Sequence, residues 1–273
     1  AGNYQIKASK IRGVASNGML CAASELALED HQSGIIELPD STETGIEAAI
    51  ALGLDDALFD INITPNRGDA MSVYGIARDL AAAGLGTLKA LTLAPLPEVK
   101  STPLALGEID QDCAELNLAL LEIEQMADSP KWLKDRLNQI GLKTKNLAVD
   151  ITNYLCFSYG QPLHVYDQAK IEGKISLKKI QQKTAFKALD GKIYQLPEAS
   201  LVVADQQKIL SLAGIIGGAS SEVTTSSQKL LFEAAAFTPP IIARTGQNLQ
   251  LVTEARQRFE RGHDRTLCQA VLG

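Results

Sequence analysis

The chain has 273 residues, 45% of them hydrophobic and 21% charged, and a formal net charge of −6. This composition is typical of a soluble globular protein with enough apolar residues for two modest domains, and it argues against overall disorder. The negative charge argues against a protein that coats nucleic acid with its whole surface, so any RNA binding must use local basic patches. No apolar run reaches the roughly 18 residues of a membrane helix, so no membrane contact is expected.

The first third of the chain predicts a mixture of short elements. We expect a short strand, a turn at Gly13 and an extended piece within Tyr4–Met19, then a strand at Gly34–Leu38. A helix should follow, with Asp69 as its N-cap and Gly84 just past its end. Its apolar face is formed by Val73, Ile76, Ala77, Leu80 and Ala81.

A proline-rich stretch, Leu91–Leu104, indicates a linker and a domain boundary. Beyond it, Leu118–Leu121 suggests a strand. Ser129 as N-cap, Pro130 at the first helical position and Gly141 at the end then predict a helix. A second helix is expected from about Leu147 to Tyr159.

The remainder of the chain is typical of an antiparallel sheet. The Asp190–Gly191 dipeptide between two strand candidates is a strong hairpin signal. Strands are predicted at Lys174–Ile180, Ala185–Leu189, Lys192–Leu196, Leu201–Ala204, Leu210–Leu212 and Lys229–Ala235, and helices at Pro239–Gly246 and from Asp264 onward. The fold class is therefore α+β, mostly antiparallel sheet with flanking helices, in more than one domain.

Most standard catalytic and metal-binding signatures are missing from the sequence. There is no GxSxG, HExxH or Walker A motif, and the four cysteines form no CxxC pair. No metal site is therefore predicted, and reduced thiols in a cytoplasm explain the cysteines most simply. The glycine-rich stretch Gly214–Gly218 fits a tight strand-to-turn passage best, or otherwise a backbone wall that lets a ligand approach closely.

Two residues stand out by their surroundings. Of the three histidines, His31 and His263 are expected to face solvent, whereas His164 follows a proline and has apolar neighbours. Such a histidine is either a hydrogen-bonded structural residue or a catalyst. Glu233 lies inside an eight-residue apolar run, where it is either exposed on an edge strand or buried for a purpose. Its own sequence leaves both readings open.

Basic residues form two clusters. The lysine cluster contains Lys170, Lys174, Lys178, Lys179, Lys183, Lys187 and Lys192, and the arginine cluster contains Arg256, Arg258, Arg261 and Arg265. Each is either an ordinary solvated surface or a surface that follows RNA phosphates. Acidic residues interleave with the arginines, so local ion pairing explains part of the second cluster.

Seven segments, in order, resemble the bacterial phenylalanine–tRNA ligase β subunit. They are Lys10–Val14 with Gly18–Cys21, Asp60–Arg67, Val149–Tyr154, Gly160–His164, Leu212–Gly218, Thr253–Ala255 and Arg258–Gly262. Each alone is weak, but all of them in the family's order are specific.

The resemblance implies an (αβ)₂ heterotetramer that attaches phenylalanine to tRNA(Phe) with ATP and magnesium, at a site on the α subunit. This chain would therefore carry no ligation site and need no cofactor. It would contribute the editing of mischarged tyrosyl-tRNA. The implied domains are the end of an OB-type tRNA-binding domain (1–35), part of a small α+β domain (36–95), a linker (96–113) and an editing domain (114–273).

Carried over residue by residue, the resemblance also predicts a site. His164 and Glu233 would be catalytic, and tRNA contacts would come from Lys143, Arg256 and Arg258. The pocket would be lined by Thr152, Ala213, Gly217, Gly218, Thr253 and Ala255. Lys143 stands where the family usually has arginine, and Arg256 replaces a small polar residue.

The chemistry of editing explains these residue types. An apolar pocket rejects an isostere that adds one hydroxyl only about a hundredfold, so a second, hydrolytic site is needed. Glu233 would accept the tyrosine hydroxyl, and phenylalanine would leave the buried carboxylate unpaired at a cost of roughly 1–3 kcal/mol. His164 would orient water, and the N–H groups of Gly217 and Gly218 would stabilise the oxyanion.

Two other functions remain open on the sequence. One is a non-catalytic RNA- or subunit-binding module in which Glu233 is a solvated edge residue. The other is a stand-alone hydrolase of a different ester, which the N-terminal resemblance to the ligase subunit disfavours.

Overall fold

The computed structural model describes residues 6–28, 34–91 and 104–273, which form two compact units, 1–57 and 58–273. In the first unit, strands β1 (Ser9–Ile11) and β2 (Val14–Ser16) form an antiparallel hairpin. Arg12 and Gly13 both have positive φ at its turn, as predicted for Gly13. None of the described residues of this unit is buried, so they share no hydrophobic core.

The other described residues of the first unit contain little regular structure. A short 3₁₀ turn (Ala23–Leu26) and helix α1 (Ala48–Ala51) are its only other helical segments among the described residues. The strand predicted at Gly34–Leu38 is reduced to an isolated bridge between Ala22 and Ile35, because no longer partner strand lies beside it. His31, predicted to face solvent, lies outside the described residues.

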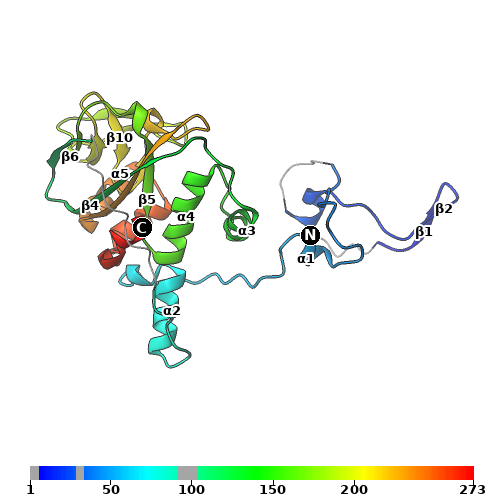
Figure 1. The fold of residues 1–273 in the computed structure, drawn as a ribbon. Coiled ribbons are helices and arrows are strands. Elements are labelled where there is room, and N and C mark those ends of the chain that lie inside the picture. Colours follow the sequence, from blue (N-terminus) through cyan, green and yellow to red (C-terminus); the bar gives the residue numbers. More distant parts are fainter. Residues whose placement is uncertain (1–5, 29–33, 92–103) are drawn as a thin grey trace. The chain divides into compact units, whose positions relative to one another are not determined.

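The second unit is built on two main sheets with helices around them (Figure 1). The three-stranded sheet has the order β4-β12-β5, and the five-stranded sheet has the order β11-β10-β9-β6-β3. Their strands are β3 (Leu106–Ile109), β4 (Cys113–Glu122), β5 (Leu163–Asp167), β6 (Ile175–Lys179), β9 (Leu201–Ala204), β10 (Ile209–Leu212), β11 (Ile216–Gly217) and β12 (Lys229–Phe237). Every pairing is antiparallel except β3 with β6, which confirms the predicted α+β class.

A separate hairpin and five α-helices, together with short 3₁₀ turns, complete the described part of the unit. The hairpin consists of β7 (Thr184–Lys187) and β8 (Ile193–Leu196), and its turn contains the predicted Asp190–Gly191. The helices are α2 (Val73–Ala82), α3 (Lys131–Gln139), α4 (Leu147–Tyr159), α5 (Pro239–Leu249) and α6 (Glu254–Arg261). None of the helices in the described part of the chain is long and apolar enough to cross a membrane.

The main core includes side chains from both sheets. Leu177, Val203 and Leu212 come from the five-stranded sheet, and Tyr166 and Leu231 come from the three-stranded one. These side chains are almost completely buried. Fully burying a side chain of this size stabilises a fold by about 1.5–3 kcal/mol, so this contact fixes how the two sheets sit together.

The two units divide the chain differently from the predicted domains. Residues 58–91 belong to the second unit, so the boundary between the units lies inside the predicted domain 36–95, whose last residues, 92–95, lie outside the described residues. The reason is side-chain contact: Arg78 on α2 forms an ion pair with Asp264 at 3.1 Å, and the backbone of Gly68 packs tightly against Gly262. The predicted linker 96–113 is also wrong at its end, because Leu106–Ile109 forms β3.

Several predicted helix ends shift for local reasons. Ser72, not Asp69, caps α2, because its hydroxyl accepts the Gly75 N–H at 2.9 Å. Ser129 does not cap α3, since its hydroxyl donates to Asp150 at 2.6 Å. From Asp264 onward the chain forms two 3₁₀ turns instead of the predicted helix. Helix α6 and strand β5 were not predicted.

Candidate functional site

Glu233 and His164 are cross-strand neighbours. In the register of the three-stranded sheet, Glu233 on the central strand β12 lies opposite His164 on β5. Directly paired residues on antiparallel strands place their side chains on the same face. Glu233 is only 6% exposed. The carboxylate is therefore buried beside the histidine rather than solvated on an edge.

A hydrogen-bonded chain fixes the carboxylate. The Tyr166 hydroxyl donates to Glu233 Oε2 at 2.5 Å and lies 2.8 Å from the Ser211 hydroxyl. Tyr166 belongs to β5, two residues from His164, and Ser211 belongs to β10 in the other sheet. The chain thus links both sheets through one buried acid.

Burial dominates the electrostatics of Glu233. It raises the pKa of the carboxyl from 4.5 to about 7, and the hydrogen bond from Tyr166 opposes this shift only in part. Burial, together with the charge of Glu233, raises the pKa of Tyr166 well above its ordinary value. Near neutral pH the acid is thus poised between its two protonation states, which is common at functional sites.

His164 is half-buried and packs against the Tyr166 ring. Its ring packs edge-on against the Tyr166 ring with centroids 4.4 Å apart. Burial lowers the pKa of His164 from 6.5 to about 4, so the imidazole is neutral at pH 7. A neutral imidazole has one nitrogen free to accept a hydrogen bond, which is what a water-orienting group requires.

Gly217 is needed beside the histidine for steric reasons. A Cβ atom at this position would lie 2.3 Å from His164 Cε1 and 2.7 Å from Leu189 Cδ1. Any side chain larger than hydrogen would therefore displace the ring or the hairpin. This close packing explains the glycine, while the predicted backbone wall for a ligand stays a prediction.

Gly218 does not fit its predicted role. Its N–H donates to the Leu210 carbonyl at 2.8 Å, and a Cβ would lie 2.6 Å from the same oxygen. The structure thus corrects the expectation that this N–H stabilises an oxyanion, because it is already used in the contact with β10. The tight packing explains why glycine is required here.

Thr253 connects helix α6 to the segment before Gly217. Its hydroxyl accepts the Arg256 N–H at 3.1 Å as the helix cap and donates to the Ile215 carbonyl at 2.8 Å. Ala213 in the same segment is buried in the main core, and Ala255 packs against that core. Thr253 therefore ties α6 to the segment that precedes Gly217, and the predicted pocket-lining roles of all three residues stay predictions.

Thr152 is less closely connected to the pair. It is buried on α4, a helix that packs against β5, and its hydroxyl donates to the Val149 carbonyl of its own helix at 2.7 Å. Within the described ranges no hydrogen bond joins it to His164 or Glu233. Its predicted place in the pocket lining stays a prediction.

The two predicted RNA-binding arginines are buried and internally bonded, which corrects that expectation. Arg256 is 8% exposed, pairs with Glu260 at 2.8 Å and donates to the Leu251 carbonyl. Arg258 is 3% exposed, pairs with Glu254 at 2.7 Å and stacks on Phe157 at 4.6 Å. Both guanidinium groups donate to backbone carbonyls inside the protein, Arg256 to Leu251 and Arg258 to Met71, so these donors are not free to bind RNA.

Lys143 is exposed, so its predicted contact with RNA stays a prediction. Tyr166 and Ser211 were missed. The alternation of β5 could have found Tyr166, two residues from His164 on the same face. Nothing in the sequence around Ser211 points to the site, because its part depends on contact between two sheets.

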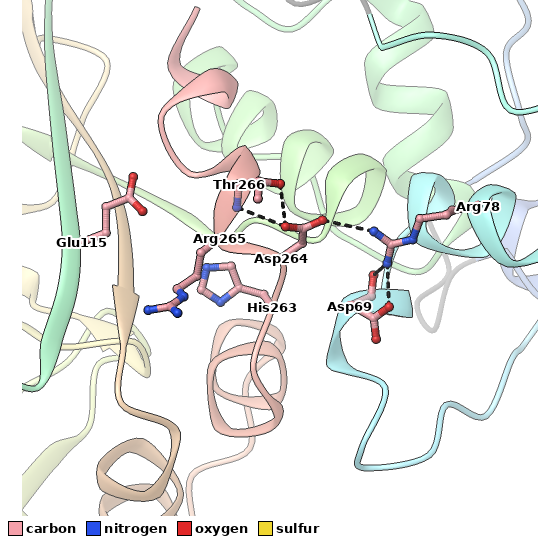
Figure 2. Close-up of a pocket in the computed structure, with 7 residues that line it drawn as sticks. All are labelled: Asp69, Arg78, Glu115, His263, Asp264, Arg265 and Thr266. Atoms are coloured by element: carbon pink, nitrogen blue, oxygen red, sulfur yellow. Dashed lines mark hydrogen bonds and ion pairs between the residues drawn. The ribbon is translucent and has the colours of Figure 1, made fainter.

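His263 also differs from expectation. It is not solvent-facing: its ring packs edge-on against Phe259 at 5.0 Å, and burial lowers its pKa to about 4. Among the described residues its buried Nε2 has no hydrogen-bond partner. It borders a pocket of about 620 Å³, shown in Figure 2, where Arg78 binds both Asp69 and Asp264.

A larger groove of about 1090 Å³ lies along β6, β7 and the turn between β9 and β10. Neither this groove nor the pocket of Figure 2 includes His164 or Glu233. At the pair itself, the Tyr166 hydroxyl donates to the Glu233 carboxylate, and His164 is half-buried beside them.

Comparisons with known proteins agree with the sequence resemblance. The B3/4 domain family matches residues 113–273, and a putative tRNA binding domain family matches residues 3–47. The β subunit of phenylalanine–tRNA ligase from Mesorhizobium japonicum is 44% identical over 256 residues, which is 93% of this chain and 32% of the relative. The Rickettsia typhi β subunit is 42% identical over 99% of this chain and 36% of its own length.

A solved N-terminal fragment of the Pyrococcus horikoshii phenylalanyl-tRNA synthetase β subunit covers 67% of this chain and 59% of its own. Its TM-score of 0.40 and 18% identity are too low to support any conclusion about the site. The chain spans about a third of the length of the curated relatives it matches. It belongs to the B3/4 domain family and is homologous to that third of the phenylalanine–tRNA ligase β subunits.

Proposed function

We propose that this chain is part of the β subunit of a phenylalanine–tRNA ligase and that its B3/4 domain hydrolyses mischarged tyrosyl-tRNA(Phe). One observation supports this most: a buried carboxylate, Glu233, lies directly opposite a half-buried, neutral histidine, His164, on adjacent strands. A buried acid is costly to keep unless it has a task.

Recognition of tyrosine follows from the acid. Glu233 already accepts one phenol, that of Tyr166, on Oε2. Its other oxygen, Oε1, has no hydrogen-bond partner among the described residues, so it is the acceptor for a substrate hydroxyl. Phenylalanine would leave only Oε1 without its donor, not the whole carboxylate. The preference is therefore expected within the roughly 1–3 kcal/mol of one hydrogen bond to a charged group.

Hydrolysis needs a positioned water molecule. The water oxygen bonds to the ester carbonyl carbon, the bond from that carbon to the ribose oxygen breaks, and a proton passes from the water to the ribose oxygen. Neutral His164 can accept a hydrogen bond from that water and orient it, which requires no covalent nucleophile. With a pKa of about 4 it is a weak base, so orientation is its main contribution.

The non-catalytic alternative assumed that Glu233 is solvated on an edge strand, and the buried position of Glu233 does not fit that assumption. A binding module would place Glu233 on the exposed face of an edge strand, but β12 is the central strand between β4 and β5 and the side chain is buried. A buried position on a central strand is usually occupied by an apolar residue, because burying a carboxylate is unfavourable. No other observation favours that module as the sole function.

The test is to mix the chain with tyrosyl-tRNA(Phe) and phenylalanyl-tRNA(Phe) and follow release of each amino acid. Faster release of tyrosine, lost in His164→Ala and Glu233→Ala variants that remain folded, supports editing. Equal release of both amino acids, or none at high protein concentration with tRNA still bound, contradicts it.

The proposal also sets the context of the chain. Ligation would need an α subunit in an (αβ)₂ heterotetramer together with ATP and magnesium, whereas hydrolysis at His164 and Glu233 would need no cofactor. The four cysteines are all unpaired, which suits a reducing cytoplasm.

A further inference from the structure

Charge is unevenly distributed along this acidic protein. The lysine cluster, residues 170–192, contains seven lysines and only two acids, Glu172 and Asp190, which gives it a net charge of +5. Since the whole chain carries −6, the other residues together carry −11. Such local segregation creates a positive field that attracts polyanions while the rest of the surface repels them.

The structure gathers part of this cluster around one concave surface, the groove of about 1090 Å³. Two of the lysines that line the groove already form ion pairs with carboxylates. Lys179 pairs with Asp112 at 2.5 Å, and Lys208 pairs with Asp205 at 2.8 Å. Lys178 on β6 and Lys187 on β7 also line the groove, are exposed, and form no ion pair among the described residues.

Most of the other polar side chains that line the groove are uncharged. It includes the amides of Gln181, Gln182, Gln206 and Gln207 and the hydroxyls of Thr184 and Ser220, with Glu108 as its one acid outside an ion pair in the described structure. Unpaired ammonium groups among uncharged donors suit phosphodiester oxygens and ribose hydroxyls. Phe186 is the only aromatic ring in the lining, so base stacking is a minor contribution.

The groove adjoins the candidate site. Phe186, Ala219 and Ser220 form part of its wall, and the last two directly follow the Gly217–Gly218 segment. A Cβ on Gly218 would lie 2.9 Å from the Phe186 ring, and one on Gly217 would lie 2.3 Å from His164. Two consecutive glycines therefore contact the two sides: Gly218 lies against the groove-lining ring, and Gly217, at the end of β11, lies against the histidine.

We propose that this groove binds the sugar–phosphate backbone of tRNA, with Lys178 and Lys187 as its phosphate contacts. This rests on the proposed function, since it identifies how the same domain holds the RNA whose ester it cleaves. It is separate from the putative tRNA binding domain matched at residues 3–47, and it replaces Arg256 and Arg258 as the RNA contacts of this domain.

The experiment measures binding of uncharged tRNA(Phe) to the full 273-residue chain at several salt concentrations. The variant is Lys178→Gln/Lys187→Gln. The control, Lys131→Gln/Lys229→Gln, removes the same formal charge from exposed, ion-paired positions on the same unit that do not line the groove.

We expect the groove variant to bind tRNA at least about tenfold more weakly at low salt. The slope of log affinity against log salt concentration should fall by the amount that corresponds to about two phosphate contacts. The control should bind like the wild type. Equal affinities and slopes in both variants would overturn the proposal. It would also fail if the groove variant lost binding to inorganic phosphate or phosphatidylglycerol vesicles but not to tRNA.

The result stays separate from the outcome for editing. If the wild type releases tyrosine, the groove variant should raise KM for tyrosyl-tRNA and leave kcat unchanged, because neither lysine touches the ester. A lower kcat with unchanged KM would overturn the proposal. If the wild type binds tRNA but releases no tyrosine, the proposed function fails while the binding comparison still decides the groove.

Discussion

Replacing Glu233 with glutamine should make the stability of this protein less sensitive to alkaline pH. The substitution keeps the shape of the side chain and an oxygen that can accept from Tyr166, but it removes the titrating group. The pKa of Glu233 is about 7 in the folded chain against an ordinary 4.5, because burial penalises the charged form. Folding therefore favours the protonated acid.

The sign follows from this direction. A raised carboxyl pKa contributes stability that is fully present below pH 4.5 and is lost as pH rises through about 7. A shift of about 2.5 pH units at 1.36 kcal/mol per unit corresponds to about 3 kcal/mol. The glutamine variant lacks this loss. It should gain about 3 kcal/mol relative to the wild type between pH 4.5 and pH 8.

Two histidines titrate in an overlapping range and must be separated from Glu233. His164 and His263 both have a pKa lowered to about 4, so the chain loses stability as pH falls below about 6.5. Burial alone lowers the pKa of His164, without a contribution from Glu233. The loss is therefore the same in wild type and variant, and it cancels in their difference.

The assay is chemical denaturation of both proteins at half-unit steps from pH 4.5 to pH 8. Glu198→Gln serves as the control, because that side chain is exposed and its charge stays in water in both states. For a unit of this size the expected difference at pH 8 corresponds to roughly 6–12 °C in Tm. A difference that does not change with pH would refute the claim that Glu233 is withdrawn from water.

Three further substitutions test the site. Ala255→Trp should abolish tyrosine release while circular dichroism shows a folded chain, because a larger ring at this predicted pocket-lining position would fill the space for the tyrosine side chain; unchanged release would contradict the pocket lining. Tyr166→Phe should cost about 1–3 kcal/mol in denaturation and raise the pKa of Glu233 further, since it removes the one hydrogen bond that lowers it. No change in stability would show that this bond contributes little. Gly217→Ala should slow tyrosine release about 100-fold by displacing His164, with tRNA affinity unchanged as the control reading.

Local chemistry let the sequence determine much of the secondary structure. Helix α4 begins after Asn146, whose side chain accepts the Val149 N–H at 3.1 Å, and it ends at Gly160 with a φ of 75°, so its predicted limits are confirmed. The hairpin at Asp190–Gly191 is confirmed for the same reason, because Gly191 takes the positive φ that the turn needs. These signals act over a few residues and can be read without a fold.

The sequence also singled out Glu233 as anomalous but left two environments open. Only the tertiary structure placed its strand in the middle of a sheet, opposite a histidine 69 residues earlier in the chain. The same limit applies to Arg258, which looked like a surface charge and is buried against Phe157 and the Met71 carbonyl.

The division between the two sources has one physical reason. Helix caps and tight turns are fixed by short-range hydrogen bonds and backbone dihedrals, which neighbouring residues carry. Burial and strand register depend on contacts between segments far apart in the chain, and their energies exist only once the sheets have packed. The sequence therefore determined which residues were unusual, and the tertiary structure decided that Glu233, His164 and Tyr166 meet.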